Sequence, residues 1–257
     1  MILVTNDDGI EAPGLHALVL ELSSIATVIV CAPKEEQSAS SHALTVRESL
    51  LVEEVHMDGA HQAWSVDGKP ADCVKLAVLG LVKEPIMLVI AGINKGSNLG
   101  TDTLYSGTVA AAMEGAFHGL PAIAVSLCLG QQIEEPIDFS PAAKIVKELV
   151  GKWVARDLWI HGNSMLNVNI PHIPDTQRKG YTFARLGVQH YTDEYKLVQD
   201  STEETRYQLH GERIPTLLED ESLDSVAVAR GYVSITPLST DRTDYGLLEE
   251  MKKKENA

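Results

Sequence analysis

Apolar runs alternate with helical patterns along the first half of the chain. Four runs of apolar or β-branched residues occur, at 2–5, 26–32, 86–92 and 122–127. Continuous runs of this length are typical of strands that are buried on both faces of a sheet. The intervening apolar spacing predicts three helices, at about 13–23, 71–82 and 107–118. Alternation of strand and helix predicts a parallel sheet with helices on both faces.

The pattern changes in the second half of the chain. It predicts a helix at about 140–155, another strand of the main sheet at 164–171 and a final strand at 231–238. Residues from about 172 to 230 are more polar and rich in turns, which indicates an antiparallel elaboration such as hairpins, an oligomerisation arm or a flap. The acidic run at 217–225 lies within it. The end of the chain, EEMKKKENA, has the composition of a solvated, frayed end.

Composition excludes some classes of function. A formal net charge of −15 and a pI near 4.9 argue against binding of a nucleic-acid polymer, because phosphate backbones require basic patches. A small anionic substrate remains possible. The three cysteines sit in apolar surroundings, so we expect buried free thiols in a reducing cytoplasm. We expect no signal peptide and no membrane span, since the apolar stretches are too short to cross a bilayer.

Polar loops follow three of the predicted strands. Ligands of parallel sheets lie beyond the carboxyl ends of the strands, so these loops are expected on one rim. Their polar residues are Asn6, Asp7 and Asp8 in the first loop, Ser38, Ser40, Ser41 and His42 in the second, and Asn94, Asn98, Asp102 and Ser106 in the third. Adjacent carboxylates repel unless a cation or full solvation separates their charges. With hydroxyl and amide oxygens they form a ligand set that suits Mg²⁺, Mn²⁺ or Ca²⁺. The alternative is a solvated turn or a helix cap.

Ser106, Gly107 and Thr108 open the predicted helix at 107–118. A helix N-terminus with hydroxyl groups can bind a phosphate, although a serine or threonine N-cap is the ordinary alternative. Beside a metal site the phosphate cradle is favoured. His42 is a candidate general acid or substrate contact, or simply a polar loop histidine. For Asp72, helix capping is the first interpretation and a place near the substrate the second.

Six segments together resemble one known family. They are ILVTNDDGIEAPG, APKEEQSASSHALT, GKPADCVKLA, GINKGSNLGTDTLYSGTVAAAMEG, LNVNIP and GYVSITPL, which span residues 2 to 238. The chain resembles the survival protein SurE family of metal-dependent 5′-nucleotidases. Three positions depart from the commonest pattern of that family, Ser41, Lys69 and Leu223, and the first two bear on nucleotide preference.

The resemblance implies one divalent cation per subunit, Mg²⁺ or Mn²⁺, bound by Asp7, Asp8, Ser38 and Asn94. It implies a phosphate site formed by Asn98, Ser106, Gly107 and Thr108. The implied fold is α/β, with a Rossmann-like doubly wound, mostly parallel sheet and a smaller antiparallel C-terminal elaboration. The implied division is a catalytic core at 1–171, an elaboration or oligomerisation arm at 172–230, and a final strand returning to the core with the tail at 231–257. A homodimer or homotetramer that exchanges an arm is expected.

The resulting hypothesis is hydrolysis of nucleoside 5′-monophosphates, with 3′-monophosphates and short polyphosphate as further substrates. Asp8 is the candidate for orienting or deprotonating the attacking water, and Asn98 and Ser106 for stabilising charge on the phosphoryl oxygens. One alternative is a phosphatase that forms a phospho-aspartate on Asp7. Another is a receiver-like module, in which an acidic pair binds Mg²⁺ for signalling.

Overall fold

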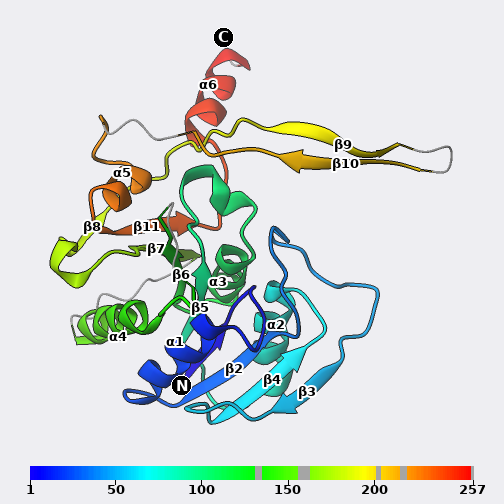
Figure 1. The fold of residues 1–257 in the computed structure, drawn as a ribbon, viewed down its shortest axis with the longest axis vertical. Coiled ribbons are helices and arrows are strands. Elements are labelled where there is room, and N and C mark those ends of the chain that lie inside the picture. Colours follow the sequence, from blue (N-terminus) through cyan, green and yellow to red (C-terminus); the bar gives the residue numbers. More distant parts are fainter. Residues whose placement is uncertain (131–134, 156–162, 201–203, 215–218, 256–257) are drawn as a thin grey trace.

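The computed structural model describes the chain except for residues 131–134, 156–162, 201–203, 215–218 and 256–257. The described residues form a nine-stranded sheet and a separate two-stranded hairpin (Figure 1). From one edge to the other, the sheet consists of β3 (Val52–Val55), β4 (Gln62–Val66), β2 (Val28–Pro33), β1 (Ile2–Thr5), β5 (Leu88–Lys95), β6 (Ala122–Cys128), β7 (Ser164–Pro171), β11 (Val233–Ser239) and β8 (Tyr181–Phe183).

Six neighbouring strands, from β4 to β7, run parallel. β1 lies between β2 and β5, with Val4 opposite both Val30 and Ile90. The chain therefore leaves β1 toward one edge and later returns to build the other side from β5. At the edges, β3 pairs antiparallel with β4, and β11 pairs antiparallel with β7. The predicted α/β class with a mostly parallel sheet is confirmed.

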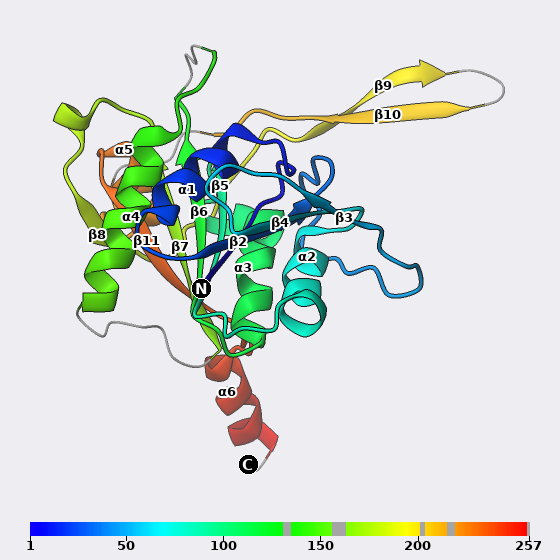
Figure 2. The ribbon, with the colours of Figure 1, turned by 90° about the horizontal axis from the view of Figure 1, so that it is seen from below.

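Helices cover both faces of this sheet (Figures 1 and 2). α1 (Pro13–Ser23) and α4 (Ser140–Ala155) contact each other on one face, and α2 (Pro70–Leu76) and α3 (Gly107–Phe117) contact each other on the other. Successive strand residues point to opposite faces. Val4 therefore packs in the core under α1 and α4, whereas Leu3 packs in the core under α2 and α3. This two-sided burial explains the continuously apolar runs.

Two further strands and the end of the second helix differ from expectation. The pattern predicted no strand between residues 33 and 86, yet β3 and β4 lie there. β3 is short and half exposed, so it carries little periodic signal. The helix expected at 71–82 is α2 followed by a π-helical turn at Ala77–Leu81. Short 3₁₀ turns also occur, at Gly100–Leu104 and Asp175–Gln177.

The C-terminal region is only partly the predicted antiparallel elaboration. An antiparallel hairpin is present, formed by β9 (Glu194–Asp200) and β10 (Thr205–His210). However, β8 joins the main sheet parallel to β11, and α5 (Asp224–Ala229) is helical. The tail is not frayed, since α6 (Tyr245–Glu255) runs through it. Residues 217–218 of the acidic run and the last two residues of the tail lie outside the described residues.

Other expectations concern thiols and membranes. Cys31, Cys73 and Cys128 are all free and buried, as predicted. In the part of the chain that the structure describes, no helix has both the length and the apolar composition needed to cross a lipid bilayer.

Candidate metal and phosphate site

The loops after β1, β2 and β5 meet at the carboxyl ends of these strands. The backbone N–H of Gln37 donates to the carbonyl oxygen of Asp7 at 2.7 Å, which joins the second loop to the first. The backbone N–H of Lys95 donates to Asp8 Oδ2 at 3.1 Å, which joins the third loop, next to Asn94, to the first. The expected convergence of the three strand ends is therefore present.

The N-terminus of α3 packs directly against Asp7. Thr108 donates from its hydroxyl group to Asp7 Oδ1, and its backbone also hydrogen-bonds this carboxylate. A Cβ at Gly107 would lie 2.8 Å from Asp7 Cβ and 2.9 Å from Ser40 Oγ, so only glycine permits this approach. The predicted helix N-terminus thus holds an anion, and that anion is the carboxylate of Asp7 itself. Its binding of a phosphate stays a prediction.

Negative charge in this site is only partly offset by the neighbouring cation of Lys95, which acts to lower the pKa of Asp8. Burial raises the pKa of Asp7, against the lowering effect of the hydrogen bonds from Thr108. Burial and the adjacent charge of Asp7 raise the pKa of Asp8 to about 6. Glu36 contributes further negative charge to both, and it accepts a hydrogen bond from Ser38 Oγ. Sequence reasoning passed over Glu36, although it stands only two residues before Ser38.

The donor atoms fit a divalent cation. Asp7 and Asp8 supply carboxylate oxygens, and Ser38 supplies a hydroxyl oxygen. Asn94 donates from Nδ2 to the carbonyl oxygen of Gly96 at 3.0 Å, which leaves its amide oxygen as the atom to ligate. Hard oxygen donors and a desolvated carboxylate pair suit Mg²⁺ or Mn²⁺. Among the described residues, no three His, Cys, Asp or Glu side chains are arranged to hold a metal ion, so hydroxyl and amide donors would have to complete the set.

The predicted phosphate residues have structural partners of their own. Ser106 Oγ accepts the backbone N–H of Val109 at 3.1 Å, so the N-cap interpretation is correct for this side chain. Ser40, in contrast, has a buried hydroxyl group without a hydrogen-bond partner, beside Gly107. An unpartnered buried hydroxyl marks a position where a ligand oxygen could bind. The hydroxyl-rich sequence of this loop was the only signal for it.

Asn98 is fixed by the two strands beside its loop. Its side chain donates to Ser126 Oγ at 2.8 Å, and its backbone N–H donates to Asn169 Oδ1 at 2.9 Å. Its carbonyl oxygen accepts from Nδ2 of both Asn167 and Asn169. These two asparagines of β7 are supporting residues that the sequence reasoning missed. Their signal was a pair of polar residues alternating within the otherwise apolar strand.

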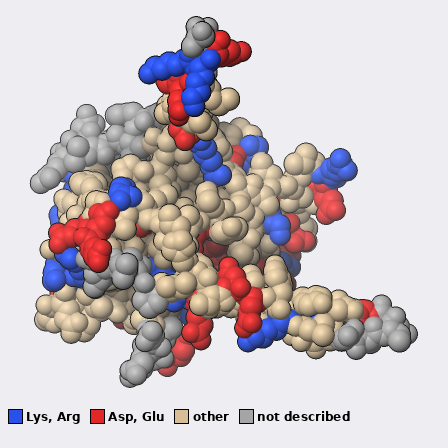
Figure 3. Space-filling model, turned by 90° about the horizontal axis from the view of Figure 1, so that it is seen from above, with Lys and Arg blue, Asp and Glu red and all other residues tan. Residues whose placement is uncertain are grey.

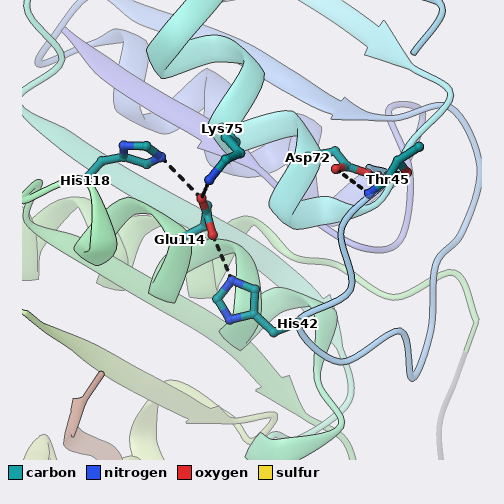
Figure 4. A network of polar contacts seen from close by, with 6 residues as sticks. All are labelled: His42, Thr45, Asp72, Lys75, Glu114 and His118. Atoms are coloured by element: carbon teal, nitrogen blue, oxygen red, sulfur yellow. Dashed lines mark hydrogen bonds and ion pairs between the residues drawn. The ribbon is translucent and has the colours of Figure 1, made fainter. Parts of the chain in front are cut away.

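His42 and Asp72 make contacts that do not involve the site directly (Figure 4). His42 Nε2 lies 2.9 Å from Glu114 Oε2. Asp72 Oδ2 accepts the backbone N–H of Lys69 at 2.9 Å, at the start of α2, which agrees with the helix-cap interpretation. Lys69 in turn donates from Nζ to Gln37 Oε1 at 2.7 Å, one residue before Ser38.

The chain is similar to known proteins over nearly its whole length. The family model for the survival protein SurE matches residues 2–193. A protein named 5′-nucleotidase SurE from Heliobacterium modesticaldum is 43% identical over 251 residues, covering 97% of this chain and 90% of that protein. One of the same name from Synechococcus sp. is 43% identical over 256 residues, covering 98% of this chain and 96% of that protein.

A solved structure agrees with the fold. The crystal structure of the SurE protein from Aquifex aeolicus superposes with a TM-score of 0.82 at 36% sequence identity, and covers 99% of each chain. The likeness therefore includes the C-terminal region as well as the parallel sheet. The chain belongs to the survival protein SurE family.

Proposed function

We propose that the chain is a 5′-nucleotidase that hydrolyses nucleoside 5′-monophosphates with the help of one divalent cation per subunit. The observation that carries the proposal is the buried carboxylate pair of Asp7 and Asp8, with raised pKa values, against the N-terminus of α3. The relatives named 5′-nucleotidase SurE support the reaction class. 3′-Monophosphates and short polyphosphate are proposed as further substrates, because they present the same phosphoryl group.

The residues of the site have separate tasks in this proposal. A bound cation would polarise the phosphoryl oxygens and lower the pKa of a water. Asp7, held by Thr108, keeps a fixed orientation as a ligand, and Asp8, Ser38 and Asn94 complete the set. Asp8 also orients the attacking water and accepts its proton, as a carboxylate within reach of a cation-bound water can do.

Charge on the transferred phosphoryl group would be stabilised by neutral donors. Asn98 and Ser106, with the backbone of Gly107 and Thr108, are proposed to face its equatorial oxygens, which carry most of the charge in the transition state. The hydrogen bonds from Asn167 and Asn169 hold the loop of Asn98 in place before substrate binds. Preorganised donors of this kind need no rearrangement during the reaction.

The hairpin of β9 and β10 supports assembly into a homodimer or homotetramer. It projects from the body of the molecule (Figures 1 and 2), and the described part of its face shown in Figure 3 consists mostly of side chains that are neither acidic nor basic. Exposed apolar side chains on it are Tyr195, Leu197, Val198, Tyr207 and Leu209. A lone two-stranded hairpin is marginally stable in water, so a second copy of the chain is the proposed cover. We further propose a cytoplasmic location, in keeping with three free thiols.

The test is phosphate release from a panel of nucleoside 5′- and 3′-monophosphates, with Mg²⁺, with Mn²⁺ and with a chelator. We expect metal-dependent release that is lost in Asp7→Asn and Asp8→Asn. Asp58→Asn serves as the matched control, because Asp58 is an exposed carboxylate outside the site. No release with either metal would contradict the proposal.

The two alternatives give different outcomes in the same preparation. A phospho-aspartate enzyme would show a covalent phosphoryl group on Asp7 after a rapid quench, with phosphate release following its decay. A receiver-like module would bind Mg²⁺ and accept a phosphoryl group without turning over nucleotides. The hydrolase proposed here should show neither a stable phosphoprotein nor binding without turnover.

A further inference from the structure

The loop at residues 34–51, which carries Ser38, has no helix or strand of its own. We name it the Ser38 loop. It contains two residues with left-handed backbone that are not glycine, Ala39 with φ 54° and Ser41 with φ 52°. Such conformations persist only where surrounding contacts impose them. The position of Ser38 therefore depends on what holds this loop against the rest of the protein.

One set of contacts joins the loop to α3 and the turn before it. The Ser41 backbone N–H donates to the Tyr105 carbonyl oxygen at 2.9 Å, and Ser41 Oγ donates to the Leu104 carbonyl oxygen at 2.7 Å. The next residue, His42, reaches Glu114 Oε2 at 2.9 Å. Its ring also stacks on Phe117, with 5.3 Å between the ring centroids. His42 therefore ends the strained turn with a contact to a buried acid.

Glu114 is a buried carboxylate whose surroundings favour its contact with His42. Its side chain is 3% exposed and also accepts from Lys75 Nζ at 2.8 Å and His118 Nε2 at 3.2 Å (Figure 4). Burial would raise the pKa of Glu114, but hydrogen bonds and charge from His42 and Lys75 hold it at about 2. A buried carboxylate that stays ionised is destabilised strongly if a partner leaves. Of its three partners, only His42 belongs to the Ser38 loop.

A second fixed point lies three residues farther along the loop. The Thr45 backbone N–H donates to Asp72 Oδ1 at 2.9 Å, and Thr45 Oγ1 donates to Asp72 Oδ2 at 2.7 Å (Figure 4). Asp72 is itself 4% exposed and caps α2. The loop is thus tied to two helices that lie on the same face of the sheet.

We propose that Glu114 is a positioning residue for the metal site, which acts through His42 to hold the turn that presents Ser38. The contact from His42 runs from the loop to a buried acid of α3, the same helix whose first turn holds Asp7. One helix therefore sets the positions of a carboxylate and a hydroxyl ligand together. The inference rests on the proposed function only in taking Ser38 as a ligand.

The experiment compares two histidines that share Glu114 as their partner. His42→Ala removes the contact between the loop and Glu114, whereas His118→Ala removes a donor at the C-terminal end of α3 and leaves that contact in place. His42→Gln keeps an N–H donor of similar reach. Mn²⁺ affinity is measured by titration calorimetry in the absence of substrate, and hydrogen exchange is followed in peptides that cover residues 36–46.

We expect His42→Ala to weaken Mn²⁺ binding about tenfold, which matches the loss of one hydrogen bond to a charged group. Exchange at the Ser41 N–H should become faster in the same variant. His118→Ala should change Mn²⁺ affinity less than about twofold, and His42→Gln should restore most of the lost affinity.

Unchanged Mn²⁺ affinity in His42→Ala would overturn the inference. So would an equal loss in His118→Ala, since that result would assign the effect to the charge balance of Glu114 rather than to the loop. The proposed nucleotidase activity is judged separately, on the wild-type protein. If the wild-type protein released no phosphate, the calorimetry and the exchange data would still test the contact between the loop and Glu114.

Discussion

Replacing Gly107 by alanine tests whether the contact between α3 and Asp7 shapes the site. The added Cβ would lie 2.8 Å from Asp7 Cβ, 2.9 Å from Asp7 Oδ2 and 2.9 Å from Ser40 Oγ, whereas ordinary contacts measure 3.4–4 Å. Asp7, Ser40 or the start of α3 must therefore move by roughly half an ångström. Each of these groups belongs to the site, so the strain reaches the proposed ligands directly.

The structure predicts different magnitudes for stability and for turnover. Inserting one methyl group into a packed position costs about 1–3 kcal/mol in the free energy of unfolding. Displacing a ligand by a fraction of an ångström should lower turnover more steeply, by about tenfold to a hundredfold. Urea unfolding gives the first quantity. Phosphate release at saturating Mn²⁺, corrected for the folded fraction, gives the second.

Gly115→Ala is the matched control, because Gly115 lies in the same helix but away from the site. Its added Cβ would lie 2.8 Å from Val89 Cγ2 and 2.9 Å from Val89 Cβ, in the core beneath α3. The control should lose similar stability and keep its turnover. Wild-type turnover in Gly107→Ala, or an equal loss in Gly115→Ala, would refute the reasoning.

Three further predictions concern stability and assembly. In metal-free protein, Asp8 has a pKa of about 6 in the folded state, compared with the ordinary value of 3.8. The free energy of unfolding therefore falls as pH rises between these two values, because the folded state loses the proton that it binds more tightly. Asp8→Asn should therefore be more stable than wild type at pH 7 by about 2 kcal/mol, and equally stable near pH 4, in urea unfolding with chelator. Gly151→Ala should gain about 0.5–1 kcal/mol in the free energy of unfolding, because Gly151 is an exposed position of α4 and, beyond the neighbouring backbone of its own helix, no atom of the described residues lies within 4 Å of the new Cβ; a rise in Tm would show it. Leu197→Ser with Leu209→Ser should lower the mass measured by light scattering, and an unchanged mass would exclude the hairpin from assembly.

The sequence pattern alone predicted those strands that are buried on both faces of the sheet and are followed by turn-forming residues. Residues 2–5 were predicted and found as β1, since every side chain in that strand is buried. Asp7 and Asp8 could be placed at its carboxyl end for the same reason. β3 escaped detection because its four residues do not alternate: the two end residues are half-buried and the two middle residues are exposed. The parallel pairing of β8 was also missed, since the direction of a three-residue strand is set by its partner.

Contacts between distant residues explain most of what the sequence could not predict in the site. The hydroxyl group of Thr108 donates to Asp7, which is 101 residues away, and this contact was not expected; the place of Thr108 beside a phosphate stays a prediction. His42 was considered as an acid or a substrate contact, yet its partner is Glu114, 72 residues farther on. Neither pairing follows from local spacing, because each depends on how α3 sits on the sheet.

The separation of Asp7 and Thr108 along the chain has a consequence for folding and for the effect of a bound ligand on stability. While the chain is being synthesised, Asp7 is complete 101 residues before Thr108, so its carboxylate lacks this hydrogen-bond partner until α3 begins to form. The unfolded chain likewise has no assembled set of donors. A ligand of this site would therefore stabilise only the native state. An occupied site would raise the midpoint temperature of unfolding of the whole sheet. A single calorimetric scan with and without Mn²⁺ would report both occupancy and global folding.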